Sequence, residues 1–159
     1  MFYGSSITQG ACCSRPGNTY YNILSRRLDF DYINLGFSGS AKGEKEIADY
    51  IASLDMSAFV CDYDYNAPTP EHLAATHARL VATVRKAHPD IPILLMSKPR
   101  HTLTQDDQAR LAIIRKTYDD ARAKGDENIY LLTGPELTAL CGDDGTVDNV
   151  HPTDLGFLA

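Results

Sequence analysis

Short apolar segments alternate with helix-like segments along the whole chain, and this alternation is the feature that most constrains the fold. The apolar segments have the length of strands and lie at residues 1–3, 32–35, 58–63, 91–96 and 128–132. Helix-like segments begin after Thr69 and at Thr104, and weaker ones cover residues 18–28 and 44–54. Such alternation favours right-handed crossovers and a parallel sheet with helices on both faces. The sequence therefore predicts an α/β fold: a three-layer α/β/α, flavodoxin-like domain with a doubly wound, parallel, five-stranded sheet.

Two of the helix-like segments carry start signals as well as periodicity. Thr69 and Pro70 supply an N-cap and a first-turn proline. A stripe with helical spacing follows them at Leu73, His77, Leu80, Val81 and Val84. Because His77 lies on this stripe, we interpret it as a packed core or boundary histidine. Thr104 has Asp107 three residues after it, as in a capping box, which predicts a second helix start.

Length and charge limit the function classes that the chain can belong to. With 159 residues, we expect a single domain over residues 1–159, truncated at both ends because the chain opens within a strand and lacks a longer closing helix. The formal net charge of −6 argues against a nucleic-acid partner, since phosphate binding requires a basic face. No apolar run approaches the roughly 20 residues of a membrane span, and no signal peptide is visible. We therefore expect no membrane partner and a cytoplasmic location, while the oligomeric state stays open.

The four cysteines do not form a metal-binding or redox motif. They are Cys12, Cys13, Cys61 and Cys141, and no pair has C-x-x-C spacing. Cys61 lies within an apolar run, where a thiol packs as a small hydrophobic group. We expect reduced thiols and no bound metal.

Polar residues suited to acyl transfer follow the predicted strands. Ser6 follows the first strand, Gly39 the second and Asn66 the third. Asp148 and His151 lie near the C-terminus, with a spacing that lets one turn present both side chains. Because sites in such sheets form beyond the carboxyl ends of the strands, we expect these residues to meet at one edge.

These segments offer the groups that acyl transfer needs. A histidine takes the proton of a serine hydroxyl, and an aspartate orients the histidine. The three-residue spacing of Asp148 and His151 suits such a pair. The oxyanion of the tetrahedral intermediate needs N–H donors, which glycine-containing turns and an Asn side-chain amide can supply.

The order of these residues resembles the four motif blocks of the SGNH hydrolases, also called the GDSL esterase/lipase superfamily. Gly4-Ser5-Ser6-Ile7 resembles the nucleophile block, and Asp148-Asn149-Val150-His151 resembles the final Asp-x-x-His block. Gly39 and Asn66 match the oxyanion residues of the second and third blocks. The resemblance therefore implies that Ser6, Asp148 and His151 are catalytic. It also implies an oxyanion hole made of the N–H groups of Ser6 and Gly39 and the side chain of Asn66. The nucleophile block is most similar to a bacterial subgroup that reads Gly-Ser-Ser-Ile-Thr-Gln-Gly. The resemblance implies a serine esterase that hydrolyses small carboxylic esters through an acyl-enzyme, without a cofactor.

The sequence departs from the family pattern in two of the blocks. Ser5 replaces an aspartate, which we expect to alter the support of the first turn and not the nucleophile. The third block reads Asp64-Tyr65-Asn66-Ala67 in place of Gly-x-Asn-Asp. Ser38 is the competing serine, but its surroundings lack the final glycine of a Gly-x-Ser-x-Gly elbow.

Two other classes of protein remain as alternatives. A catalytically inactive SGNH-fold module would bind a ligand at the same cleft, but the intact nucleophile, base and acid argue against it. A flavodoxin-like nucleotide-binding domain would need a phosphate loop after the first strand, and Ser5 to Gly10 lack the lysine of such a loop.

The substrate is less constrained than the reaction. The chain has no long apolar insertion that would form a lid, which favours small, short-acyl esters such as O-acetylated carbohydrates. Arg100 and His101 follow the fourth strand and are either pocket-rim residues or parts of a solvated loop. Tyr63 and Tyr65 flank the third block and are candidates for the wall of an acyl pocket.

Overall fold

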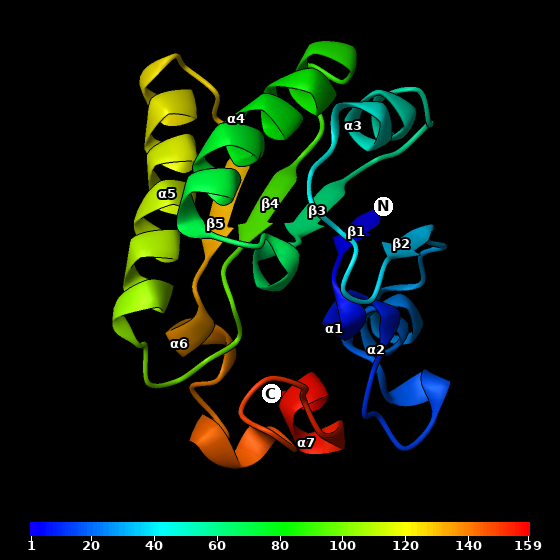
Figure 1. The fold of residues 1–159 in the computed structure, drawn as a ribbon. Helices are drawn as coiled ribbons and strands as arrows, with labels where there is room; N and C mark the ends of the chain where they lie inside the picture. Colours follow the sequence, from blue (N-terminus) through cyan, green and yellow to red (C-terminus); the bar gives the residue numbers. More distant parts are fainter.

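Five short parallel strands form the central sheet of the computed structural model, which describes residues 1–159 (Figure 1). The strands are β1 (Phe2–Gly4), β2 (Asn34–Gly36), β3 (Phe59–Asp62), β4 (Ile93–Met96) and β5 (Ile129–Leu132). Their order in the sheet is β2-β1-β3-β4-β5, and every pair is parallel. The chain winds outward from β1 to β2 and then in the opposite direction from β3 to β5, so the sheet is doubly wound. The predicted fold class is confirmed.

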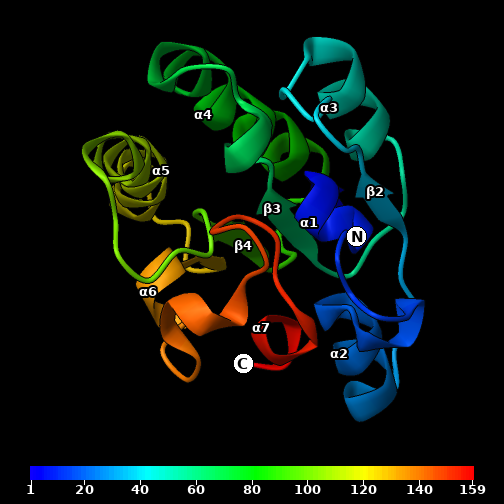
Figure 2. The same cartoon turned by 60° about the horizontal axis from the view of Figure 1, so that its bottom comes forward.

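Helices cover both faces of this sheet and gather at the carboxyl ends of its strands. The α-helices are α1 (Ser6–Gln9), α2 (Tyr20–Leu28), α3 (Lys45–Ala52), α4 (Pro70–Ala87), α5 (Gln105–Ala123), α6 (Gly134–Leu137) and α7 (Asp154–Leu158). Short 3-10 helices lie at Pro16–Asn18, Asp64–Asn66 and Gly142–Gly145. Helices α3, α4 and α5 lie on one side of the sheet, and α2 and α7 lie on the other (Figure 2). None of the helices is long and apolar enough to cross a membrane.

The two long helices begin where their start signals predict. The Thr69 side chain accepts a hydrogen bond from the backbone N–H of His72 (3.2 Å), and Pro70 opens α4. At α5, Thr104 and Asp107 form a reciprocal capping box. These caps satisfy backbone donors that a helix N-terminus otherwise leaves without partners.

Four of the five strands are shorter than their apolar runs predict, whereas β1 keeps its predicted length and is shifted by one residue. β1 has three residues, and it pairs with Asn34–Gly36 on one side and with residues 60–62 on the other. Residues 32–33 of the predicted second strand therefore lie outside the paired register. A strand ends where it no longer has a neighbouring strand to pair with. The apolar run of one strand does not show where its neighbours end.

Alternation along the strands gives the sheet two different faces. Tyr3, Phe59 and Ile93 point to the side of α3, α4 and α5, where they join a continuous core with the buried faces of those helices. This core also contains His77, which is 1% exposed, as predicted from its place on the stripe of α4. The neighbouring positions point to the side of α2 and α7, and one of them is the carboxylate of Asp62.

Candidate active site

The turn after β1 presents Ser6 at the carboxyl edge of the sheet. The Ser5 side chain accepts a hydrogen bond from the N–H of Ile7 (3.1 Å) and so caps α1, which begins at Ser6. This is the support that Ser5 provides in place of an aspartate. The turn is tight: a Cβ added at Gly4 would lie 2.1 Å from Thr8 Oγ1, so glycine is required there. As the first residue of α1, Ser6 has no hydrogen-bond acceptor for its N–H within the protein.

The structure brings Ser6 and the two distant residues Asp148 and His151 together. Ser6 Oγ lies 2.9 Å from His151 Nε2, across 145 residues of sequence. His151 Nδ1 lies 2.8 Å from Asp148 Oδ2. The His151 side chain is 26% exposed, so solvent and substrate can reach the hydroxyl–imidazole contact.

Asp148 is held as a carboxylate although it lies at the surface. The backbone N–H and the ring of His151 both donate to it, and these bonds lower the pKa of Asp148 to about 2. An ionised Asp148 accepts the Nδ1 proton of the ring, which leaves the lone pair of Nε2 directed at Ser6 Oγ. A proton can therefore move from Ser6 to His151 without a change in ring orientation.

The two predicted oxyanion residues lie on connected turns. Gly39 has a φ of +68° in the turn after β2, and its N–H makes no hydrogen bond within the protein. Asn66 Oδ1 accepts from the backbone N–H of Ala41 (3.3 Å), which leaves the side-chain NH₂ as a donor without a protein acceptor. A further contact supports the same turn, because Gln9 Oε1 accepts from the N–H of Ser38 (3.2 Å). The Gln9 contact was not predicted, since it joins α1 to the second block only in the folded chain.

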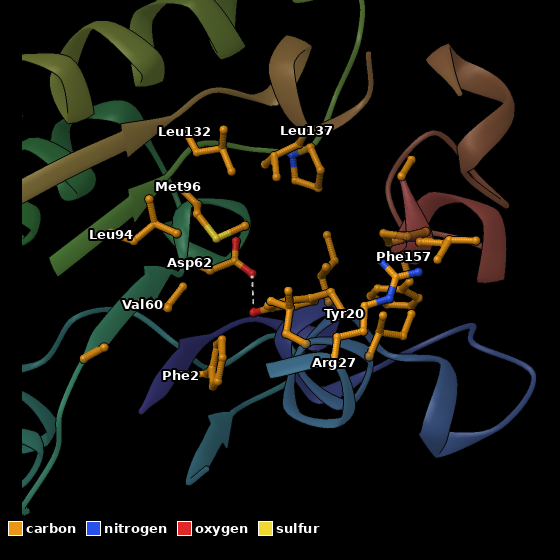
Figure 3. A pocket seen from close by; sticks show the side chains of 18 of the residues that line it. Phe2, Tyr20, Arg27, Val60, Asp62, Leu94, Met96, Leu132, Leu137 and Phe157 are labelled. Carbon is orange, nitrogen blue, oxygen red and sulfur yellow. Dashed lines mark hydrogen bonds between the residues drawn. The ribbon is translucent and has the colours of Figure 1, made fainter. Parts of the chain in front are cut away.

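An apolar cavity of about 540 Å³ lies between the sheet and the helices α2 and α7 (Figure 3). Ile7 and Pro152 line it, but their neighbours Ser6 and His151 do not. Asp62 lies in this cavity and accepts hydrogen bonds from Thr8 (2.8 Å) and Tyr20 (3.4 Å), the latter drawn in Figure 3. Burial raises the pKa of Asp62 to about 7 and outweighs the opposite effect of the two bonds.

The structure corrects the role considered for Tyr63. Its side chain is 1% exposed and lies in the core, where the hydroxyl bonds to Thr76 (2.9 Å) and the ring stacks on His77. Tyr63 therefore does not wall an acyl pocket.

Of the other residues whose roles were left open, Arg100 contacts the turn that carries Asp148 and His151. The Tyr65 ring lies under the ammonium of Lys98, at 5.0 Å, and its hydroxyl is buried without a hydrogen-bond partner. Arg100 donates to the carbonyl oxygen of Asn149, between Asp148 and His151 (2.9 Å). His101 is exposed on the same loop.

The structure also shows the state of the cysteines and the placement of possible metal ligands. All four cysteines are free thiols, and Cys61 is buried in the core. The structure contains no group of three His, Cys, Asp or Glu side chains placed to hold a metal ion.

A parallel α/β/α sheet with a serine, a histidine and an aspartate in hydrogen-bond contact beyond its carboxyl edge is an arrangement typical of serine hydrolases. Comparison with known families is consistent with that class. The model of the GDSL-like Lipase/Acylhydrolase family matches residues 1–159, so the chain belongs to this family.

Solved structures of similar proteins extend the comparison. A Bacteroides ovatus protein described as a GDSL-like lipase is 38% identical, with a TM-score of 0.85 over 98% of this chain and 48% of its own. A salicylyl-acyltransferase of a tetracycline biosynthetic pathway has 21% identity and a TM-score of 0.83 over 99% of this chain and 50% of its own. A family two carbohydrate esterase from Clostridium thermocellum has 16% identity and a TM-score of 0.75 over 99% of this chain and 58% of its own. The chain thus spans about half the length of these proteins. No match was found among curated proteins.

Proposed function

We propose that the protein is a serine esterase that hydrolyses small carboxylic esters through an acyl-enzyme. The observation that carries this proposal is the pair of contacts made by His151, at 2.9 Å to Ser6 Oγ and 2.8 Å to Asp148 Oδ2. Membership of the GDSL-like lipase/acylhydrolase family supports the same reaction.

The reaction begins with attack by Ser6. As Ser6 Oγ bonds to the ester carbonyl carbon, His151 Nε2 takes the hydroxyl proton, and Asp148 stabilises the imidazolium that results. The carbonyl oxygen becomes an oxyanion, for which the free N–H groups of Ser6 and Gly39 and the Asn66 amide are donors. The bond to the alcohol then breaks, and the alcohol leaves with the proton from Nε2.

Water completes the reaction by the same steps. His151 Nε2 takes a proton from a water molecule, whose oxygen attacks the acyl carbon of the Ser6 ester. The second tetrahedral intermediate collapses, the carboxylic acid is released, and Ser6 Oγ recovers its proton from His151. No step requires a metal or an organic cofactor.

We propose O-acetylated carbohydrates as the substrate class. Solved structures with the same fold include carbohydrate esterases and a two-domain esterase active on acetylated mannans, at 16% and 22% identity. The site lies among exposed loops, which suits an ester on a larger polar molecule. A cytoplasmic location and the absence of a nucleic-acid partner stay predictions.

A fluorophosphonate probe tests the reaction class, because it reacts with a serine that a base has activated. We expect one adduct, located at Ser6 by mass spectrometry and lost in His151→Ala. Ser38→Ala is the matched control and should label like the wild type. A folded protein that is not labelled, or is labelled at another serine, would contradict the proposal.

The substrate class has a separate measurement. Acetate release from acetylated oligosaccharides should accompany hydrolysis of short-chain nitrophenyl esters, with poor turnover of long-chain ones. Equal turnover of long and short acyl chains would contradict the substrate class and leave the reaction class intact.

A further inference from the structure

Arg100 connects the start of α5 to the turn that carries the candidate base. Its Nη1 donates to Asp107 Oδ2 (3.1 Å), and its Nη2 donates to the carbonyl oxygen of Asn149 (2.9 Å). Asn149 lies between Asp148 and His151. The Arg100 side chain is 24% exposed; its bond to Asp107 is partly buried, and its bond to Asn149 lies at the surface.

The Asp107 end of this connection is fixed. The Asp107 side chain is 3% exposed and accepts from the N–H and hydroxyl of Thr104 and from Lys98 Nζ (3.1 Å). Burial by itself would raise the pKa of Asp107, but the bonds from Thr104 and Lys98 outweigh burial and lower the pKa to about 2. Arg100 therefore binds a permanent carboxylate at the N-terminus of a 19-residue helix.

The backbone beneath Arg100 is also fixed. Lys98 N–H donates to the buried carboxylate of Asp64 (3.1 Å), and the N–H of Gly134 donates to Ser97 Oγ (2.8 Å). A Cβ added at Gly134 would lie 1.9 Å from the carbonyl oxygen of Lys98, so α6 packs directly on this segment. Arg100 consequently extends from a rigid base to a turn at the surface.

The contact of Arg100 with Asn149 affects Asp148 through one peptide group. The carbonyl of Asn149 and the N–H of Val150 belong to the same peptide unit. Arg100 binds the carbonyl, and the N–H donates to Asp148 Oδ1 (3.0 Å). A cation on one side of a peptide group strengthens the hydrogen bond that the other side donates. Asn149 has a φ of +64°, a left-handed conformation that asparagine adopts more readily than most other residues.

We propose that Arg100 is a positioning residue for the general base, an inference that rests on the proposed function. It holds the Asn149–Val150 peptide in place, so Asp148 keeps its bond to His151 Nδ1 and His151 keeps Nε2 directed at Ser6. The turn also has restraints of its own, since the N–H of Asn149 donates to Thr146 Oγ1 (3.1 Å) and the N–H of Val147 donates to the carbonyl oxygen of His151 (2.9 Å). These bonds lie within the turn, whereas Arg100 reaches it from the segment before α5.

Two substitutions at Arg100 test this role by the hydrolysis of a short-chain nitrophenyl ester. Arg100→Met removes both bonds, and kcat should fall about 10- to 100-fold with KM nearly unchanged, because small misplacements of a catalytic group have effects of this size. Arg100→Lys keeps the charge but not the two-armed geometry, and it should lie between Arg100→Met and the wild type. The pH profile of kcat/KM should change in Arg100→Met and also in Asp148→Asn, because both substitutions alter the contact of Asp148 with His151.

Arg85 provides the matched control. It also binds an aspartate, Asp126 (2.8 Å), and several carbonyl oxygens, but it lies at the C-terminus of α4, away from the site. Arg85→Met should lower the melting temperature and leave kcat and the pH profile unchanged at a temperature where the protein is folded. A purely structural role of Arg100 would give the same result as Arg85→Met.

The possible outcomes separate this inference from the proposed function. If the wild type hydrolyses the ester and Arg100→Met keeps its kcat and pH profile, the role of Arg100 is wrong and the proposed function stands. An Arg100→Met effect confined to KM assigns Arg100 to substrate binding and also overturns the inference. If the wild type neither turns over esters nor reacts with the probe at Ser6, both are wrong.

Discussion

Each of the two ring nitrogens of His151 has one partner, and this division sets the direction in which a proton moves. Asp148 binds Nδ1 and Ser6 Oγ faces Nε2, so the imidazole accepts a proton from one side only. Asp148 stays ionised because its pKa is lowered to about 2 by the N–H groups of His151. Asp148 therefore does not protonate in any pH range where the imidazole itself acts as a base.

Asn66 offers a residue-scale test of the oxyanion hole, because its two side-chain atoms have different tasks. Oδ1 accepts from Ala41 N–H, while the NH₂ group is the candidate donor to the oxyanion. Asn66→Asp keeps the acceptor and removes the donor. We expect kcat to fall about 100- to 1,000-fold with little change in melting temperature.

The measurement is steady-state hydrolysis together with thermal unfolding of the same samples. Gln9→Ala removes the bond to Ser38 N–H and serves as a comparison, with a smaller expected loss because no donor to the oxyanion is deleted. Activity of Asn66→Asp within tenfold of the wild type would exclude the amide from the oxyanion hole.

At the scale of elements, local sequence signals predicted where the two long helices begin. Pairing between strands decided where the strands begin and end. Thr69 and Thr104 cap α4 and α5 as predicted, because a cap depends on residues within one turn. Strand limits depend on the three-residue β1 and its partners, so the apolar runs overestimated them.

In the candidate site, too, some features follow from local sequence signals and others from contacts between distant segments. The motif blocks predicted that Ser6, His151 and Asp148 lie together, and the structure brings them into contact. The first three blocks follow β1, β2 and β3, whereas the block with Asp148 lies beyond α6. The supporting bonds of Gln9 and Arg100 connect segments far apart in the sequence, and they carry no local sequence signal.

The packing of α4 against α5 contains a pH-sensitive element, His77. Its Nδ1 bonds to Thr117 (2.9 Å), and burial lowers the pKa of His77 to about 4 from 6.5. The unfolded state therefore binds more protons between pH 6.5 and 4, so the free energy of unfolding should fall as the pH falls through this range. The full contribution is at most about 3 kcal/mol.

His77→Asn keeps a partner for Thr117 and cannot protonate, so its unfolding free energy should fall less between pH 6.5 and 4. Urea denaturation at several pH values gives the comparison. His101→Asn, at an exposed histidine, should retain the slope of the wild type. If the free energies of unfolding of the wild type and His77→Asn fall in parallel as the pH falls, His77 is not the source of the pH dependence.

At the scale of the whole molecule, the two faces of the sheet are packed unequally. One face joins α3, α4 and α5 in a continuous core, whereas the other borders the 540 Å³ cavity beneath α2 and α7. The carboxylate of Asp62 lies on the second face, directly below the turn that carries Ser6, and Thr8 connects the two. The nucleophile turn therefore rests on a buried ionisable group.

Asp62 should make the whole molecule less stable as the pH rises. Burial raises the pKa of Asp62 from 3.8 to about 7, so the folded state binds more protons than the unfolded state between these values. The stabilising contribution of the protonated group is complete below about pH 4 and is lost as the pH rises through 7. It amounts to at most about 4 kcal/mol.

Asp62→Asn stays neutral and still accepts from the Thr8 hydroxyl, so urea unfolding should show a gain in stability at pH 8 and little gain at pH 4. Asp31→Asn, at an exposed position on the rim of the same cavity, should not change this pH dependence. An equal effect of Asp62→Asn at both pH values would mean that folding does not raise the pKa of Asp62, with the cavity admitting enough water to solvate the carboxylate.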